Sequence, residues 1–174
     1  MYKKYSISTS RINGKVLRVE QISAAVLEHA GYHHGARNLD DVIVGIAQDF
    51  VGSNNVRLIT KSGQFGSRSA GGKDAAQSRY GHTKPEKILP YLIREEDDPL
   101  LTYKIDENEH VEPEIYYPII PWVLINGAYG IGTAWSTFIP NYDFKDILNY
   151  LRARIQGKQL SPLTPKYRGY KGNC

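Results

Sequence analysis

The chain has 174 residues, of which 41% are hydrophobic and 23% are charged, values typical of a globular protein with one domain or with one domain and part of another. The single cysteine, Cys174, excludes a disulfide framework and a cysteine zinc site. The N-terminal sequence MYKKYSISTSR is polar and basic, and no apolar run is long enough to cross a membrane, so we expect neither a signal peptide nor a membrane span.

The net charge of +4 is concentrated in the first half of the chain. Residues 1–84 hold twelve Lys and Arg against six Asp and Glu, whereas residues 85–174 hold ten against twelve. The segment 57–84 alone contains six basic residues and one acid, Asp74. A segment with one sign of charge suits phosphate binding, although a solvated loop would have the same composition.

A helix is predicted over residues 16–27. Its apolar residues, Val19, Ile22 and Val26, recur at helical spacing. We expect this helix to end at Gly31, because glycine commonly follows the last helical turn.

A second, more strongly amphipathic helix is predicted to begin at Asn38. Asn38 is a suitable N-cap, and Asp41 lies near the positive end of the helix dipole. One apolar stripe contains Leu39, Val42, Ile43, Ile46, Ala47 and Phe50. The short turn GYHHG (31–35) between the two helices predicts a helix-turn-helix arrangement, as in DNA-binding proteins.

The segment after these helices predicts a winged helix. VRLIT (56–60) has the composition of a short strand, and the glycine-rich KSGQFGSRSAGGK (61–73) is typical of a β wing or a mobile loop. Its glycines permit close backbone approach, and Arg68 and Lys73 offer cations to phosphate. This segment does not match a phosphate-binding P-loop, because no Gly-Lys-Ser/Thr follows at the required spacing.

A third helix is predicted from Pro85 to Arg94, with Pro90 expected to kink or shorten it. An acidic turn (94–99) follows, and residues 100–105 are expected to form a hairpin with the stretch near Val111. The composition changes after residue 112, so we place a module boundary near 110–116. A last helix is predicted over 143–156, with Phe144, Ile147, Leu148, Leu151 and Ile155 on one face.

Two further motifs suit contacts with nucleic acid. His33 and His34 lie in a tight turn at a helix start, where imidazoles can hydrogen-bond a phosphate or simply cap the helix. Ile131 lies between two glycines in NGAYGIGT (126–133). It is either a core residue or an apolar wedge that inserts between base pairs and bends DNA.

Tyr80 is the strongest candidate for a reactive group. It lies between Arg79 and Gly81 in a polar loop, with few apolar neighbours to bury it. A phenol has a pKa near 10, so a phosphotyrosine diester has a good leaving group and can be resealed by a sugar hydroxyl. Such a nucleophile needs a nearby cation to offset charge on the phosphate oxygens, and Arg79 provides one.

Together these stretches resemble the type IIA DNA topoisomerases of eukaryotes and large DNA viruses. The resemblance runs from about residue 17 to the C-terminus. It is carried by YHHG (32–35), AQDFVGSNN (47–55), GQFGSR (63–68), GGKDAAQSRY (71–80), VEPEIYYPIIPWVLINGAYGIGT (111–133) and IPNYDF (139–144). A proline that commonly precedes the Arg-Tyr pair in relatives is replaced here by Ser78.

The resemblance implies a role for several residues. Tyr80 matches the nucleophile that forms a 5′-phosphotyrosyl link, and Arg79 the arginine that stabilises the transition state. His34 matches a histidine at the scissile phosphate. The remaining matches are Tyr32, which contacts DNA, Lys73, a basic residue of the catalytic loop, and Ile131, which intercalates and bends the gate DNA.

The resemblance also implies an α+β fold with two modules. Residues 1–110 are expected to form the winged-helix DNA-cleavage domain. Residues 111–174 are expected to begin an α/β tower domain that is incomplete here.

The cofactors and partners implied by the resemblance lie largely outside this chain. Mg²⁺ and ATP are expected to bind to a TOPRIM module and an ATPase module that the chain lacks, so we expect the fragment alone to be inactive. The expected partners are double-stranded DNA, those modules of the parent protein, and a second copy of the parent. The expected location is nuclear, or the compartment of viral DNA replication. The alternative function is a winged-helix module that binds or bends DNA without cutting it.

Overall fold

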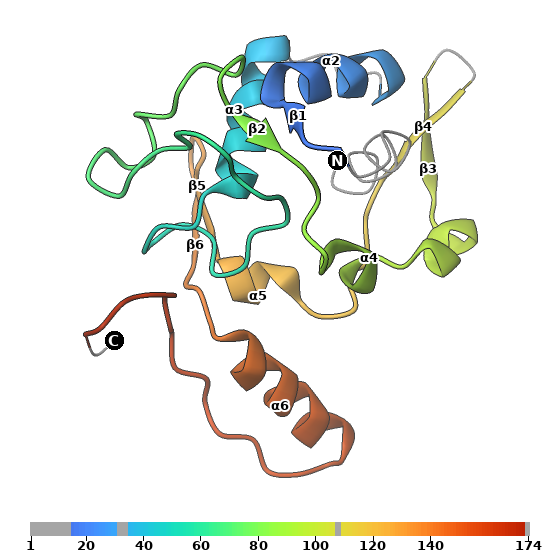
Figure 1. The fold of residues 1–174 in the computed structure, drawn as a ribbon. Coiled ribbons are helices and arrows are strands. Elements are labelled where there is room, and N and C mark those ends of the chain that lie inside the picture. Colours follow the sequence, from blue (N-terminus) through green and yellow to red (C-terminus); the bar gives the residue numbers. More distant parts are fainter. Residues whose placement is uncertain (1–14, 31–34, 107–108, 173–174) are drawn as a thin grey trace. The chain divides into compact units, whose positions relative to one another are not determined.

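The computed structural model describes residues 15–30, 35–106 and 109–172, and the chain divides into two compact units. Met1–Gln48 and Arg57–Ile119 make the first unit, and Asp49–Val56 and Ile120–Cys174 make the second. Helices and three separate two-stranded antiparallel sheets occur together (Figure 1). The expected α+β class is confirmed. Within the described residues, no helix is long and apolar enough to cross a membrane.

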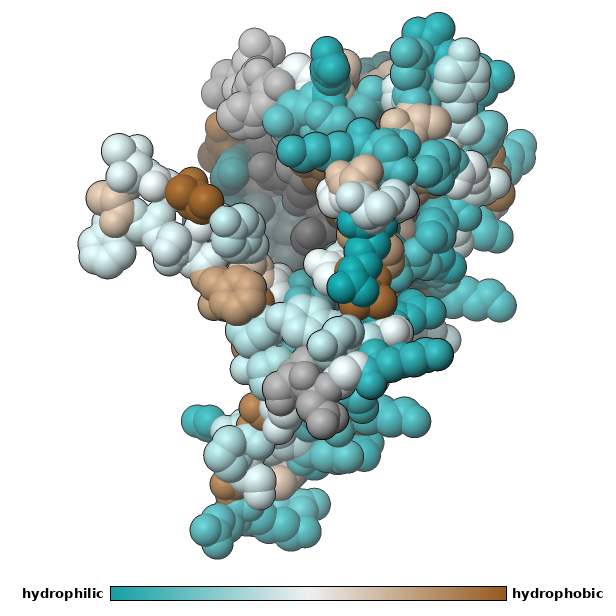
Figure 2. Space-filling view, turned by 90° about the vertical axis from the view of Figure 1, so that its left-hand side faces the viewer, coloured by the Kyte–Doolittle hydropathy of each residue, from teal (hydrophilic) through white to brown (hydrophobic). Residues whose placement is uncertain are grey.

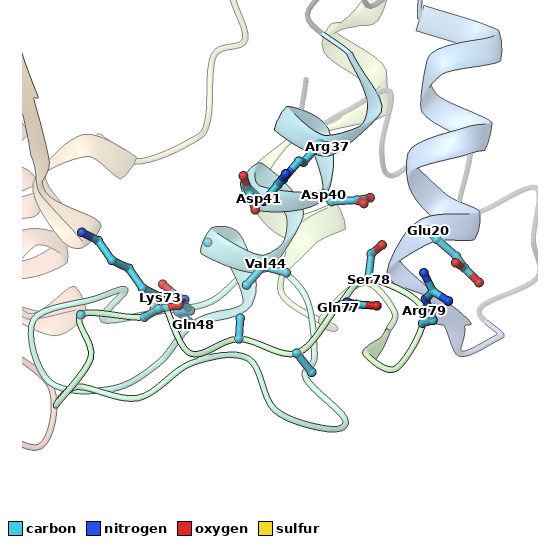
Figure 3. Close-up of a pocket in the computed structure, with 15 residues that line it drawn as sticks. Glu20, Arg37, Asp40, Asp41, Val44, Gln48, Lys73, Gln77, Ser78 and Arg79 are labelled. Atoms are coloured by element: carbon cyan, nitrogen blue, oxygen red, sulfur yellow. Dashed lines mark hydrogen bonds between the residues drawn. The ribbon is translucent and has the colours of Figure 1, made fainter.

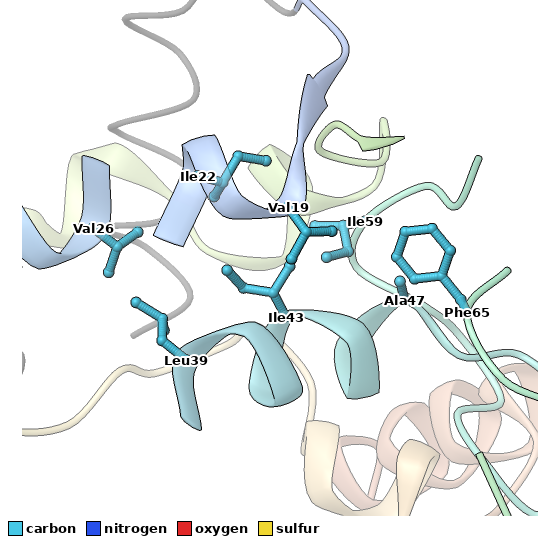
Figure 4. Packing of buried hydrophobic residues seen from close by; sticks show 8 residues of the cluster. All are labelled: Val19, Ile22, Val26, Leu39, Ile43, Ala47, Ile59 and Phe65. Atoms are coloured by element: carbon cyan, nitrogen blue, oxygen red, sulfur yellow. The ribbon is translucent and has the colours of Figure 1, made fainter. Parts of the chain in front are cut away.

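The core of the first unit lies between α2 (Val19–Ala30) and α3 (Ala36–Ala47). The apolar residues predicted on these helices face each other there, as Figure 4 shows. The buried cluster contains Val19, Ile22, Val26, Leu39, Ile43, Ala47, Ile59 and Phe65. The helical spacing of apolar residues therefore predicted the centres of both buried faces, because one stripe on each helix is enough to form a two-helix interface. The predicted stripe was too long at its end, since Phe50 lies beyond the last residue of α3.

The bounds of α3 differ from those predicted. Its N-cap is Gly35, with φ of 83°, and no side chain caps it. The prediction of Asn38 as the cap was therefore wrong, because the helix begins two residues earlier and Asn38 lies inside it. The helix ends at Ala47, and Gln48 is its C-cap.

An isolated bridge replaces the predicted strand 56–60. The only named strands in the described part of this region are β1 (Leu17–Arg18) and β2 (His82–Thr83), which pair with each other. Ile59 takes part only in an isolated bridge with Pro85. Residues 61–73 form turns and loop rather than a β wing. A strand of five residues was therefore the wrong prediction, because the chain pairs here through single bridges.

The third predicted helix is much shorter than expected. α4 spans only Leu89–Leu92, with Pro90 in its first turn, where a proline needs no intrahelical N–H partner. The acidic segment forms a 3₁₀ helix, η1 (Glu95–Leu100). The predicted hairpin is confirmed as β3 (Tyr103–Asp106) paired with β4 (Glu109–Pro113).

The second unit contains two helices and one hairpin. These elements are α5 (Trp122–Asn126), the paired strands β5 (Ala128–Ile131) and β6 (Ser136–Ile139), and α6 (Phe144–Ile155). α6 confirms the predicted last helix, and its N-cap Asp143 accepts a hydrogen bond from the Lys145 backbone N–H at 2.9 Å. Its apolar stripe is not continuous, since Ile147 is buried whereas Ile155 is 86% exposed.

Asparagine side chains tie together distant segments of the second unit. Asn55 donates to the backbone carbonyls of Tyr142 and Lys166 at 2.9 and 2.7 Å, and its oxygen accepts from the Arg168 N–H at 2.8 Å. The buried Asn141 donates to the Ser53 carbonyl at 2.8 Å. Buried amides with their hydrogen bonds made can fix segments that lack regular structure.

The Gln48 side chain anchors the loop 61–80 to the end of α3. Its amide nitrogen donates to the carbonyls of Phe65 and Gly72, at 2.9 and 3.2 Å. Gly72 has φ of +82°, and a Cβ there would lie 2.5 Å from the Gln48 amide nitrogen. The loop therefore closes on Gln48 only because glycine occupies position 72.

We expect Gln48→Glu to lower the free energy of unfolding by about 1–3 kcal/mol. The substitution keeps the shape of the side chain and replaces its two N–H donors with a charged acceptor facing two carbonyl oxygens. Urea unfolding measures the difference. Gln77→Glu, which adds the same charge to the exposed loop, is the matched control, and equal stabilities for the two variants would contradict the anchoring role.

Candidate active site

Tyr80 is the last residue of the loop 61–80 and lies two residues before β2. Its side chain is 64% exposed, and its backbone N–H donates to the Gln77 carbonyl at 2.9 Å. The loop starts and ends at one point, because Ser62 and His82 exchange two backbone hydrogen bonds of 2.9 Å. The exposed phenol therefore projects from a closed backbone loop and not from a free segment.

The first turn of α2 holds the segment that carries Tyr80. The Val19 N–H donates to the Gly81 carbonyl at 2.9 Å, and the Glu20 N–H to the Ser78 carbonyl at 3.4 Å. The first amides of a helix have no partner inside the helix, so these loop carbonyls satisfy them. Residues 78–81 are thereby fixed to a helix whose inner face lies in the core.

Arg79 provides a permanent positive charge beside Tyr80. Its guanidinium carbon lies 6.0 Å from the centre of the Tyr80 ring, at the outer limit of a cation–π contact. Both side chains are exposed. The pair can therefore present a phenol and a cation to the same phosphate group.

Arg79 also lines a pocket of about 750 Å³ between α2, α3 and the loop (Figure 3). The charges in the lining are balanced: they come from Arg37, Lys73, Arg79, Glu20, Asp40 and Asp41. Asp40 is held in place by a short hydrogen bond from the Ser23 hydroxyl. The pocket is thus not a uniformly positive site, although two basic residues of the loop, Lys73 and Arg79, take part in its lining.

The two other basic residues predicted to bind DNA lie in the same loop. Arg68 and Lys73 are both exposed. The Gly71 N–H donates to the Arg68 carbonyl at 3.1 Å, in the turn that leads to Lys73. Arg68, Lys73, Arg79 and Tyr80 therefore all lie in one loop of the first unit, and of these four the contact that joins two side chains is that of Arg79 with Tyr80.

The remaining predicted site residues lie elsewhere. Tyr32, His33 and His34 fall in 31–34, which is outside the described residues. Ile131 lies in the second unit, at the end of β5, and is 75% exposed. The sequence left two interpretations of Ile131 open, a core residue or an apolar wedge. This exposure shows that the core interpretation is wrong.

The described residues bring together no three His, Cys, Asp or Glu side chains that could hold a metal ion. This part of the chain does not fit Mg²⁺ binding by itself. No chemical step is therefore assigned to a metal held by these residues.

Sequence reasoning missed two features. One is Gln48, for which no local pattern indicated a contact with a loop 17 and 24 residues away. The other is the hairpin β5–β6, which places Tyr129 and Phe138 opposite each other. The alternation in AYGI and STFI was a usable signal for strands, but the intervening glycines favoured a turn-rich interpretation.

Asp74, the single acid of the basic segment, organises the loop. One carboxylate oxygen accepts from the Ser67 backbone N–H at 2.7 Å, and the other accepts from the Gln64 side-chain amide at 3.1 Å. Hydrogen bonds from Ser67, first from its hydroxyl and then from its backbone N–H, lower the pKa of Asp74 below its usual value. The loop therefore depends on an ionised carboxylate.

We expect the Asp74 contacts to be retained near neutral pH and lost in acid. Because the pKa of Asp74 is lower in the folded loop, its stabilisation is complete above the unfolded pKa of about 4. It disappears as the pH falls through the lower folded value. The NMR chemical shift of the Ser67 backbone amide should change with pH as Asp74 titrates. In the Asp74→Asn variant this pH-dependent change should be absent. Asp146→Asn is the control, and a titration that persists in Asp74→Asn would contradict the assignment.

Comparison with known proteins shows the family of the chain. Residues 2–174 match the family model for the A subunit of DNA gyrase/topoisomerase IV. The chain is 45% identical over 159 residues to the probable DNA topoisomerase 2 of Dictyostelium discoideum, covering 91% of this chain and 10% of the relative. It is 45% identical over 166 residues to DNA topoisomerase 2 of Arabidopsis thaliana, covering 95% and 11%.

A solved structure of a related protein has the same fold as this chain. The crystal structure of the Plasmodium falciparum topoisomerase II DNA-binding, cleavage and re-ligation domain superposes with a TM-score of 0.92 at 41% identity. The match covers 99% of this chain and 24% of that one. The chain thus spans about a tenth of the length of the curated relatives it matches. On the family model, the identities and the shared fold, this chain belongs to the type IIA DNA topoisomerases.

Proposed function

We propose that this chain is the DNA-cleavage and religation portion of an ATP-dependent type II DNA topoisomerase. In such an enzyme, one duplex passes through a transient double-strand break in another. The observation that carries the proposal is the exposed Tyr80 beside Arg79, in a loop fixed to the start of α2. Binding and catalytic residues commonly lie on loops that a rigid scaffold holds in position, as α2 holds this one.

In the proposed reaction, the Tyr80 phenolic oxygen attacks a DNA phosphorus atom. A bond forms between phosphorus and this oxygen, and the bond from phosphorus to the 3′ oxygen breaks. The phenol loses its proton and the 3′ oxygen gains one, so the product is a 5′-phosphotyrosyl link and a free 3′ hydroxyl. Attack of that hydroxyl on the link reverses each step and reseals the strand.

Arg79 is assigned to stabilise the charge that develops on the phosphate oxygens. Its guanidinium stays ionised and is already near the nucleophile, at 6.0 Å from the Tyr80 ring centre. His34 is assigned to orient the scissile phosphate or to assist proton movement. Arg68 and Lys73, together with Tyr32 and His33, are assigned to contact the DNA.

Residues 1–110 are assigned to the winged-helix cleavage domain and 111–174 to the first part of the tower domain. Ile131, exposed at the end of β5, is assigned as the wedge that bends the gate DNA. Support for the wedge comes from its exposure, because a core isoleucine would be buried.

The parent protein is proposed to supply a metal-binding module, an ATPase module and a second copy of this chain. A TOPRIM module holds Mg²⁺, which offsets negative charge at the reacting phosphate when bound. An ATPase module drives strand passage, and a second copy supplies the tyrosine for the second strand. The relatives are eukaryotic, which supports a nuclear location, or the compartment of DNA replication for a viral protein. The chain alone is expected not to cleave DNA.

Tyr80→Phe should abolish covalent attachment to DNA and leave DNA binding nearly unchanged, since only the nucleophilic oxygen is lost. The test uses the polypeptide that carries this chain, with Mg²⁺ and end-labelled duplex, and detergent traps the adduct. Tyr91→Phe is the matched control, because Tyr91 is also exposed, at 73%, and lies in the same unit.

An adduct that persists in Tyr80→Phe would overturn the assignment of the nucleophile. No adduct from the unaltered protein, with intact salt-dependent binding, would instead favour the second candidate function, a winged-helix module that bends DNA without cutting it.

Arg79→Ala should slow cleavage by about 10²- to 10³-fold, the usual effect of removing a group that stabilises transition-state charge. Arg79→Lys should restore part of the rate, because it keeps the charge but not the planar fork. The adduct formed per unit time is the measurement, with binding affinity measured in parallel. Arg94→Ala, which removes an exposed arginine of the same unit, is the control. Equal cleavage rates for Arg79→Ala and Arg94→Ala would contradict the role.

A further inference from the structure

The hairpin β5–β6 presents an exposed apolar face. Its register pairs Tyr129 with Phe138 and Ile131 with Ser136, and the Gly132 N–H donates to the Trp135 carbonyl at 2.7 Å to close the turn. Tyr129, Ile131 and Phe138 are 75%, 75% and 69% exposed. Within the described residues these side chains are therefore not covered.

The three side chains must share one face of the hairpin. Side chains alternate between the two faces of a strand, so Tyr129 and Ile131 lie on the same side of β5. Phe138 is directly opposite Tyr129 and therefore points the same way. A macromolecule that lies across this face and contacts Ile131 can therefore also contact the rings of Tyr129 and Phe138.

The base of the hairpin is firmly fixed within the second unit. Gly127, with φ of +70°, precedes β5, and a Cβ there would lie 2.5 Å from the Asn141 side-chain oxygen and 2.6 Å from the Ile139 carbonyl. Asn141 is buried and bound to Ser53. This close packing makes the face a preorganised surface rather than a loose loop.

The chemistry of the segment indicates what the face meets. No charged residue occurs between Glu114 and Asp143, so the hairpin offers no cation for phosphate and no acid to repel it. Figure 2 shows a largely hydrophilic face of the molecule on which hydrophobic atoms form only separate patches. An uncharged aromatic and aliphatic face suits the floor of a DNA groove and unstacked base edges, not the phosphate backbone.

We propose that Tyr129 and Phe138 are a second part of the DNA wedge, and that they occupy the minor groove beside the base step opened by Ile131. The rings pack on the exposed base and sugar edges and hold the step open. They thereby favour DNA steps that unstack easily, such as pyrimidine–purine steps. The inference rests on the proposed function, since it needs Ile131 to meet DNA.

The test replaces both rings while keeping the hairpin. Tyr129→Thr/Phe138→Thr removes both rings and introduces β-branched residues, which suit strands. Bound duplex carrying a dye at each end reports bending by energy transfer, and 2-aminopurine at the central step reports unstacking. We expect the bent, unstacked fraction to fall and the affinity to weaken on the order of 10-fold. The salt dependence of binding should not change, because no charge is removed.

Two controls separate a local effect from misfolding. Tyr129→Phe/Phe138→Tyr keeps both rings and should bend DNA as the unaltered protein does. Tyr117→Thr/Ile119→Thr removes an exposed apolar pair of the first unit, 63% and 57% exposed, and should also leave bending unchanged. Loss of bending in the ring-exchange variant would overturn the inference.

The outcomes distinguish this inference from the proposed function. Unchanged bending and unstacking in the double Thr variant overturn the inference even when a Tyr80 adduct forms. Loss of bending in that variant without any Tyr80 adduct in the unaltered protein supports the inference and overturns the cleavage function. A changed oligomeric state with unchanged bending shows that the face meets protein instead, and also overturns the inference.

Discussion

The pairing of Ser62 with His82 closes the loop between them, and the rest of the candidate site depends on it. These two residues are twenty apart, yet two backbone hydrogen bonds of 2.9 Å join them. The first N–H groups of α2 then bind the carbonyls of Ser78 and Gly81. Because the inner face of α2 is part of the buried core, the position of Tyr80 is tied to the packing of that core. An exposed phenol is thus carried by a backbone that is fixed to the core, as the proposed nucleophile needs.

Polar contacts rather than apolar packing shape the interior of this loop. Gln48 holds its two sides through the carbonyls of Phe65 and Gly72, and Asp74 binds the Ser67 N–H. Only Phe65 enters the hydrophobic cluster. A loop built in this way leaves its basic side chains free of the core, so that Arg68 and Lys73 stay exposed. An acid within a basic segment is then understandable, since Asp74 orders the backbone.

The loop 61–80 of the first unit and the hairpin of the second unit expose different kinds of chemistry for the same proposed substrate. The first unit offers cations and a phenol, which suit the DNA backbone, whereas the hairpin of the second unit offers an uncharged apolar face. We expect salt to weaken DNA contacts of the first surface and not those of the second, because only charged contacts release counterions. In the proposed complex the two kinds of contact act together to bend the duplex, one holding the backbone and one opening a base step.

The sequence alone determined the two-helix core, since the apolar spacing in 16–27 and 38–50 is dictated by helical geometry. It also identified the adjacent Arg79 and Tyr80, and its motifs together indicated the family. The tertiary structure decided which backbone groups meet: the bridge of Ile59 with Pro85 in place of a strand, the contact of Gln48 with the loop, and the pairing of Tyr129 with Phe138. Local spacing cannot predict the first two, because each joins residues whose approach depends on the path of the whole chain between them. The alternation in AYGI and STFI was a usable signal for the strands of the third, but not for their register.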